Sequence, residues 1–274
     1  MNQFKKMNEV QNVEDLIQYL QQKGQNHKYY YHYTTWDSFE KIYQNKSFLL
    51  TRGNSLNIND QHEALMKGSY YIWNKTYIGS FSHGSSENMA MWGLYGQPSQ
   101  DAIRITIPKT AMLKWVNSID KVFIWNEEPL DQMKAEVALT DIVYASGESH
   151  SANLNLYRSN EVISTKNIAG LQAVDSDKRM TGYIKNIAWR YENEVRIRIE
   201  LPDCYPSDKI MINVPESVLD SMIIAKGPLF EPKNSQLYLQ LRESGKIEES
   251  AFTHLLKFRP LCNYCVHNFE KISE

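Results

Sequence analysis

Two glutamates at the start of an alternating segment are the residues of this sequence best suited to chemistry. Glu192 and Glu194 lead into a segment, Val195 to Leu201, in which apolar and charged residues alternate. This period of two predicts a half-buried strand, in which residues two apart project to the same face. Both carboxylates could then face one cleft, where one acid tunes the other. The alternative is an edge strand whose exposed face carries Glu and Arg in cross-strand ion pairs.

A histidine and two serines stand at the ends of two further predicted strands. Residues 29–35 are aromatic and β-branched, which predicts a strand, and His32 lies near its end, just before a helix. Ser80 and Ser82 stand two apart in the strand predicted for residues 77–82. Strand ends are where α/β folds place ligands. The alternative, that the histidine only holds the turn by a side-chain hydrogen bond, is the commoner case.

An aromatic helix follows the serine strand. Residues 89–96 fit a short helix that carries Trp92 and Tyr95 three apart on one face. Such a pair could stack on a ligand ring, whereas the alternative is an aromatic cluster packed in the core.

Two other groups have metal-binding chemistry without a recognisable ligand set. Asp60, His62 and Glu63 are close in sequence, but oxygen-rich sites need more partners than this spacing offers.

The second group is a Cys-x-x-Cys pair, Cys262 and Cys265, with His267 close behind. Zinc would be the expected ion, but the remaining cysteine, Cys204, is distant and no second pair exists. We therefore expect no metal site.

Composition limits the class of protein. The chain has 274 residues, 42% of them hydrophobic, which is ample for a core. A net charge of -2 gives no global electrostatic case for nucleic acid or membrane. No apolar run approaches the length of a membrane span, and no signal core follows the N-terminus. Three cysteines, an odd number, fit a reducing cytoplasm.

The remaining pattern predicts an α+β chain. A helix capped by Asn12 is expected to end at Gly24, and a second helix is expected to begin after Asp37 or Ser38. Further strands are expected at 48–51, 102–107, 121–125, 141–144, 209–214 and 221–227. Helices are expected at 130–137, over most of 156–187, and at 236–244 with Gly245 after its end. The sequence has no Gly-x-Gly-x-x-Gly turn between a strand and a helix, so it does not indicate a Rossmann-type dinucleotide-binding fold.

Four short motifs follow one another along the chain. They are His32-Tyr33-Thr34, Asn59-Asp60-x-x-Glu63, Ser80-Phe81-Ser82 with Met91-Trp92-x-x-Tyr95, and Trp189-x-Tyr191-Glu192-x-Glu194-Val195-Arg196. In this order the chain resembles a widespread bacterial family labelled as a domain of unknown function. Its members look related to the ADP-ribosyltransferase superfamily, which includes toxins and enzymes that modify DNA bases or act on RNA ends. The resemblance runs from about Tyr31 to about Gly227.

The resemblance implies roles for several of these residues. His32 would hold the adenosine-side ribose of NAD. Ser80 and Ser82 would support the cleft and the nicotinamide ribose, with Phe81 where the superfamily often has Thr. Glu194 would take the catalytic place.

The chemistry that the resemblance implies is cleavage of the bond between ribose and nicotinamide. A fixed carboxylate would stabilise the oxocarbenium-like cation that develops. Glu192 would orient or deprotonate an acceptor. Arg196 or Arg52 would pair with the pyrophosphate. The remaining contacts with NAD would come from Thr34 and from an aromatic ring that stacks on the nicotinamide, supplied by Tyr33, Trp92 or Tyr95.

The sequence therefore predicts an ADP-ribosyltransferase-like split, mostly antiparallel sheet at 29–230, with a helical lead-in at 1–28 and a helical tail at 231–274. The expected function is an ADP-ribosyltransferase or NAD glycohydrolase, with NAD as substrate and no metal. A protein or nucleic acid would be the acceptor, in a toxin or phage-defence system with a possible antitoxin or regulator. The alternatives are a non-catalytic nucleotide or nucleic-acid binding module with the same fold and, last, a metal-dependent hydrolase.

Overall fold

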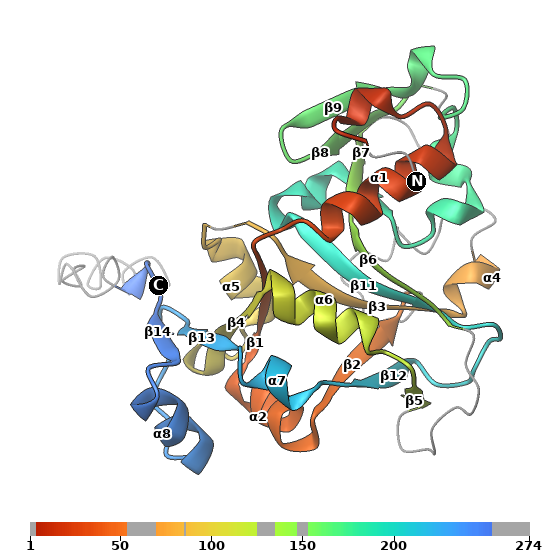
Figure 1. The fold of residues 1–274 in the computed structure, drawn as a ribbon. Coiled ribbons are helices and arrows are strands. Elements are labelled where there is room, and N and C mark those ends of the chain that lie inside the picture. Colours follow the sequence, from red (N-terminus) through yellow and green to blue (C-terminus); the bar gives the residue numbers. More distant parts are fainter. Residues whose placement is uncertain (1–3, 54–69, 85, 125–134, 147–152, 254–274) are drawn as a thin grey trace, which may run out of the picture. The chain divides into compact units, whose positions relative to one another are not determined.

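Figure 1 shows the computed structural model of the chain. Its contacts divide the chain into two units. The residues that the structure describes are 4–53, 70–84, 86–124, 135–146 and 153–253. The first unit takes its described residues from segments 1–32, 41–85 and 106–222. The second takes them from segments 33–40, 86–105 and 223–274. These boundaries do not coincide with the three-part division predicted from the sequence.

Helix α1 (Val13–Gly24) opens the first unit as predicted. The side chain of Asn12 accepts a hydrogen bond from the backbone N–H of Asp15 at 3.0 Å, which satisfies one of the free donors at the helix start. Leu16 and Leu20, four residues apart, are fully buried. The period of the apolar residues therefore defines both the helix and its buried face.

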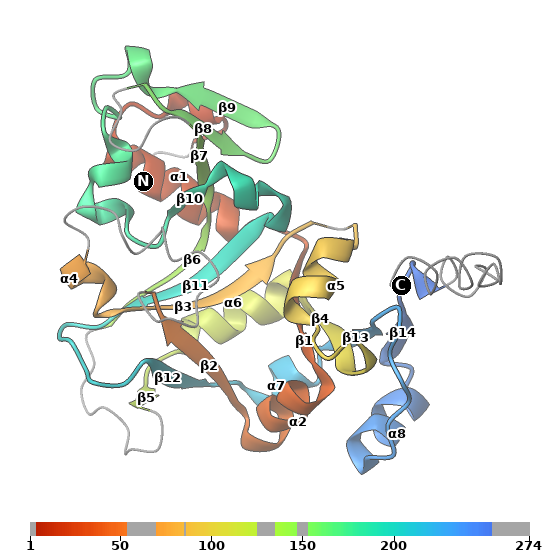
Figure 2. The same cartoon turned by 180° about the vertical axis from the view of Figure 1, so that it is seen from behind.

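An antiparallel sheet forms the centre of the first unit. Its neighbouring strands, in order, are β1 (Tyr29–Thr35), β3 (Thr76–Ser82), β2 (Ser47–Arg52), β12 (Lys209–Asn213) and β5 (Val122–Ile124). Strand β11 (Glu194–Glu200) pairs with β3 along its whole length, and β6 (Glu136–Asp141) pairs with β11 (Figure 2). The α+β class is confirmed, and the alternating segment at 195–201 is a strand of this sheet, as predicted.

Aromatic side chains fill one face of this sheet. Helix α6 (Lys109–Asn117) places the Trp115 ring 5.3 Å from that of Phe48 and 6.1 Å from that of Phe81. Phe48 and Phe81 also stack on each other, with ring centroids 5.5 Å apart. These rings supply much of the apolar area that holds α6 against the sheet.

A smaller sheet of the first unit occupies a segment that the sequence predicted to be mostly helical. Its neighbouring strands are β10 (Ile184–Asn186), β7 (Val143–Ser146), β8 (Asn155–Arg158) and β9 (Glu161–Ser164). The helical elements within residues 153–186 are the 3₁₀ turns η3 (Thr165–Asn167), η4 (Val174–Ser176) and η5 (Lys178–Met180). The helical prediction for 156–187 is wrong because Leu156 and Ile163 are strand residues that pack against α1 instead. Glu136 and Val137, predicted as the end of a helix, also lie in a strand.

The second unit contains α5 (Met89–Tyr95), the parallel pair β13 (Ile223–Lys226) and β14 (Ile247–Glu249), and α8 (Gln236–Glu243). Gly245 follows α8 with a φ of 71°, the left-handed conformation that favours glycine at this place. Strands β1 and β4 (Ala102–Pro108) contribute residues to both units.

Helix α2 (Trp36–Asn45) begins earlier than predicted. The Thr35 hydroxyl accepts a hydrogen bond from the Ser38 backbone N–H at 3.2 Å, so Thr35 takes the capping place expected for Asp37 or Ser38.

The shorter elements are α4 (Tyr70–Trp73), α7 (Glu216–Leu219), η1 (Met7–Glu9), η2 (Ser99–Asp101) and η6 (Ile187–Glu192). Every helix in the described part of the chain is too short or too polar to span a bilayer.

Replacing Gly24 by alanine should lower the free energy of unfolding. The added Cβ atom would lie 2.6 Å from Thr140 Cα and 2.7 Å from the Asp141 backbone nitrogen. Unlike the end of a side chain, these backbone atoms cannot relieve the overlap by rotating about a side-chain bond. We expect a loss of about 1–3 kcal/mol, measured by urea denaturation. The control is Gly93→Ala in α5, where a Cβ meets no atom within 4 Å and a slight gain is expected. An unchanged midpoint for Gly24→Ala would contradict this close approach.

Candidate functional site

Glu194 begins β11 on the face of the sheet that also carries Ser80 and Ser82. Ser82 lies directly opposite Glu194, and Ser80 lies opposite Arg196. Side chains opposite one another in an antiparallel pair share a face. The Ser80 hydroxyl donates to Glu194 Oε1 at 2.6 Å. The Glu194 backbone N–H donates to the Tyr144 hydroxyl at 2.8 Å. The structure thus brings together the two serines and the acid that the sequence singled out.

Two cations also hold the Glu194 carboxylate. Arg196 donates from Nε to Oε1 at 2.7 Å and from Nη2 to Oε2 at 3.1 Å. Lys185, from β10, places its Nζ 3.2 Å from Glu194 Oε2 and 2.7 Å from Glu192 Oε2. All four residues are buried, and Glu194 is only 4% exposed. Two acids and two bases cancel in formal charge, and we call these four residues the buried ionic cluster.

The charges around Glu194 keep it ionised. Burial by itself would raise the pKa of this carboxyl, but the charges of Arg196 and Lys185, with hydrogen bonds from Arg196 and Ser80, lower the pKa to about 2. Burial, and then the negative charge of Glu194, raise the pKa of the Tyr144 hydroxyl well above its usual value. At neutral pH the site therefore holds an ionised carboxylate beside a protonated phenol.

This arrangement limits what Glu194 can do chemically. Its four donors use the lone-pair sites that a carboxylate offers. A general base works best with a pKa near the working pH, which a pKa of about 2 does not provide. A fixed negative charge is the role that fits. A ligand hydroxyl would have to displace one of the donors, such as Ser80 or Lys185, to reach it.

His32 lies on the opposite face of the same sheet. Tyr31 is directly opposite Ser82 and so shares the face of Glu194, whereas His32, the next residue, points to the other face. The His32 ring packs 5.4 Å from the Phe81 ring, on the aromatic face. His32 and Glu194, which the resemblance assigned to one NAD site, therefore lie on opposite faces of the sheet.

The surroundings of His32 suit a structural histidine. Burial lowers the pKa of its ring, although a hydrogen bond between Nδ1 and the Ser80 carbonyl, 2.9 Å long, acts to raise it. Phe48 lies 5.1 Å away, centroid to centroid. Phe81, predicted as part of the ligand strand, packs with Phe48 and Trp115 and is 3% exposed.

Arg52 is also separate from Glu194. It lies opposite Tyr77 on β3, whereas Glu194 lies opposite Ser82. Five positions along a strand correspond to roughly 16 Å at about 3.3 Å per residue. The Arg52 guanidinium pairs with Asp208 instead. The resemblance implied Arg196 or Arg52 as the contact with the pyrophosphate, and of these two only Arg196 lies beside Glu194.

The predicted stacking aromatics belong to the second unit. The Tyr33 and Trp92 rings meet edge to face with centroids 4.9 Å apart, and Trp92 Nε1 donates to Glu87 at 3.1 Å. Trp92 is buried, while Thr34 and Tyr95 are half-buried. Tyr33 and Trp92 therefore form a packed pair whose polar groups have partners.

The residues that the sequence offered as metal ligands lie outside the described part of the chain. They are Asp60, His62, Glu63, Cys262, Cys265 and His267. Cys204 is described, and it is an exposed free thiol.

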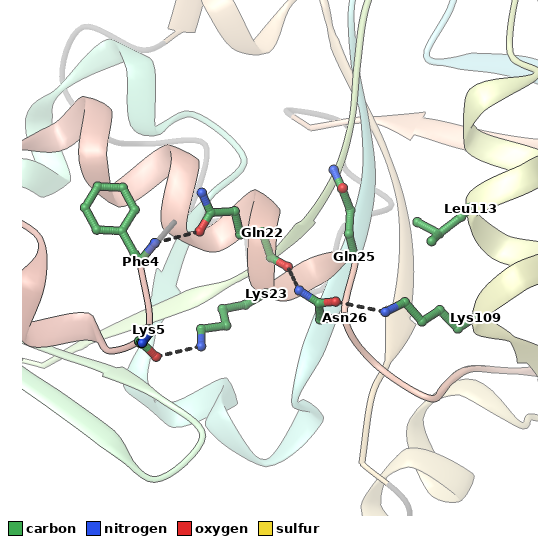
Figure 3. A pocket seen from close by; sticks show the side chains of 8 residues that line it. All are labelled: Phe4, Lys5, Gln22, Lys23, Gln25, Asn26, Lys109 and Leu113. Carbon is green, nitrogen blue, oxygen red and sulfur yellow. Dashed lines mark hydrogen bonds between the residues drawn. The ribbon is translucent and has the colours of Figure 1, made fainter. Parts of the chain in front are cut away.

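A hollow of about 580 Å³ opens in the first unit between the start of the chain, the end of α1 and the start of α6 (Figure 3). It combines three lysines and three side-chain amides with an aromatic ring and a leucine, and none of these residues is acidic. The residues that line it are Phe4, Lys5, Gln22, Lys23, Gln25, Asn26, Lys109 and Leu113. We call it the basic hollow.

Hydrogen bonds set the frame of the basic hollow. The Phe4 backbone N–H donates to Gln22 Oε1 at 3.0 Å, which fixes the start of the chain against α1. Lys23 Nζ donates to the Lys5 carbonyl at 2.9 Å, and Lys109 Nζ donates to Asn26 Oδ1 at 2.8 Å (Figure 3). The lysines also complement the partial negative charge at the end of α1, which is their alternative, purely structural role.

The sequence did not single out the basic hollow. Its lysines come from three separate segments, and no motif links Lys23 of α1 to Lys109 of α6. The Lys5-Lys6 pair near the chain start was the only local signal.

Comparison with protein-family models finds no match for this chain, and comparisons with curated proteins and with solved structures find none either. The sequence and geometry of the chain itself therefore carry the argument about what these two sites do.

Glu194→Gln should destabilise the protein by about 3–5 kcal/mol at pH 7, because it leaves Arg196 and Lys185 buried without their full counter-charge. The control is Glu216→Gln, whose side chain is 73% exposed in its pair with Lys46 and should change little.

The same variant should change the pH dependence of unfolding. The folded pKa of Glu194 is lowered from 4.5 to about 2, so its stabilising effect is complete above pH 4.5 and is lost as the pH falls towards 2. Urea midpoints of wild type and Glu194→Gln should therefore converge over that range. Parallel curves would show that Glu194 does not carry this charge.

Proposed function

We propose that this chain is a binding module for a phosphorylated nucleoside, which it holds in the basic hollow. The observation that supports this most is the meeting of Lys5, Lys23 and Lys109 with Phe4 in a hollow that no described acidic residue lines. Ammonium groups bind phosphate as point charges, and an aromatic ring offers a surface on which a base can stack. A volume of about 580 Å³ falls in the usual range for small-molecule sites.

The amides would supply recognition. Gln22, Gln25 and Asn26 each carry both a donor and an acceptor, as the edges of bases and the hydroxyls of ribose require. The Gln22 and Asn26 side chains already bond to their neighbours, so the ligand would share or exchange those contacts. Binding without chemistry is favoured over catalysis because Glu194 is buried, has four donors, and lies on the other face of the sheet from His32.

Isothermal titration calorimetry with AMP, ADP, ADP-ribose, NAD and a short oligonucleotide tests this proposal. Lys23→Met and Lys109→Met should each weaken binding at least tenfold, because each removes a cation from the hollow. Lys46→Met is the matched control, since Lys46 is exposed, pairs with Glu216 and lies outside the hollow. The proposal fails if no nucleotide binds, or if all three variants lose the same affinity.

A second candidate is an ADP-ribosyltransferase or NAD glycohydrolase with the split sheet of that superfamily. The order of the four motifs supports it, as does the hydrogen bond from Ser80 to Glu194, which would fix the catalytic carboxylate. Glu194 would act as a fixed charge beside the developing ribosyl cation, and Glu192 would orient an acceptor. Water, a protein or a nucleic acid would be that acceptor, in a cytoplasmic toxin or defence system with an antitoxin or regulator.

An assay of nicotinamide release from NAD tests this second candidate function. The wild type should release it with water, protein or nucleic acid as acceptor, and Ser80→Ala should slow release by about 10-fold or more, because Glu194 loses a positioning hydrogen bond. Glu216→Gln should leave the rate unchanged. No release from the wild type with any acceptor removes the candidate, while nucleotide binding in the calorimeter would stand.

A further inference from the structure

A second polar cluster lies in the first unit, and none of its residues lines the basic hollow. His27 precedes β1, His83 follows β3, and Asp141 ends β6. Asp141 is opposite Val195 on β11, so its side chain lies on the other face of the sheet from Glu194. Neither the sequence motifs nor the proposed functions use these three residues.

The three side chains converge on one point. His27 Nε2 lies 2.6 Å from Asp141 Oδ1. The His27 and His83 rings are nearly parallel, at 10°, with centroids 4.0 Å apart. One donor atom from each residue lies within 4.8 Å of the other two. In a tetrahedral zinc site, donors at about 2.0–2.2 Å from the ion lie roughly 3.4 Å apart, so the donor atoms of the three residues are already near that spacing, although the rings are not yet oriented for it.

Arg158 fixes the carboxylate from behind. Its Nε donates to Asp141 Oδ2 at 2.6 Å, which leaves Oδ1 directed at the histidines. Glu161 pairs with Arg158 in turn, at 3.1 Å. Metal-binding carboxylates commonly have such an outer partner. Asp141, Glu161 and Arg158 together carry a formal charge of -1, and Lys23, whose charge acts on Glu161, brings the sum over these four residues to zero.

The His83 ring is available as a neutral ligand. Burial, and then the neighbouring His27, lower the pKa of the His83 ring to about 4. Metal binding requires unprotonated imidazole, so at neutral pH no proton has to leave this ring.

We propose that His27, His83 and Asp141 bind one divalent transition-metal ion of the zinc class. Two imidazoles with one carboxylate suit such ions better than Mg²⁺ or Ca²⁺, which prefer oxygen ligands. An ion lies in the plane of each imidazole that binds it, so parallel rings cannot share one until a ring turns. Binding would therefore break the stack of His27 on His83 and replace the His27–Asp141 hydrogen bond with two metal–ligand bonds.

Titration of the metal-free full chain with Zn²⁺ and with Mg²⁺, by calorimetry, tests the site. Both should be done in a Cys262→Ser, Cys265→Ser background, because that Cys-x-x-Cys pair could bind zinc by itself. We expect one Zn²⁺ per chain and no Mg²⁺ heat. His83→Ala should weaken Zn²⁺ binding at least tenfold, and His32→Gln, a histidine outside the cluster, should not.

A second measurement uses the same Cys262→Ser, Cys265→Ser background with every histidine intact. Its result therefore does not depend on whether His83→Ala folds. Zn²⁺ should shift the ring signals of two of the seven histidines in ¹H–¹⁵N spectra. Circular dichroism without metal reports whether His83→Ala is folded. Absence of Zn²⁺ binding, full affinity in folded His83→Ala, or shifts confined to other histidines would each overturn the proposal. In that case the cluster would be a purely structural Asp–His pair.

Discussion

The contact between Glu194 and its four donors is the interaction on which the first unit most depends. It connects β11 to β3 through Ser80 and to β10 through Lys185, so it ties the small sheet to the large one. Two opposite charges cost free energy when they leave water, and only near-complete hydrogen bonding offsets that cost. The contacts that make Glu194 a good structural element are also the ones that leave it little capacity for a substrate.

Local patterns in the sequence predicted the parts of the fold whose causes are local. Helix α1 has both a cap and an apolar period, and β11 alternates, so each was found. Strands β8 and β9 have four residues each, too few for alternation to stand out from a helical pattern. Their strand state comes from packing against Leu16 and its neighbours on α1, which no local pattern records.

The candidate site was predicted in part for the same reason. The resemblance assigned Glu194 and Ser80 to one site, and in the structure a hydrogen bond joins them. The place of His32 depended on the register of β1 against β3, where a shift of one residue exchanges the two faces. Nothing within residues 29–35 sets that register. His27, His83 and Asp141 come from three distant segments. Their proximity likewise depends on how the strands of the sheet pair, which no local pattern predicts.

The interleaving of the two units has a consequence for how the chain can be made. Each unit draws on three separate segments, and residues 33–40 join a unit whose last part begins at 223. During synthesis the second unit could not assemble before residues from 223 onward had been made, and such non-local contacts slow folding. For the same reason, no single cut would release either unit whole, and an expression fragment chosen from sequence boundaries alone would carry unmatched pieces of both.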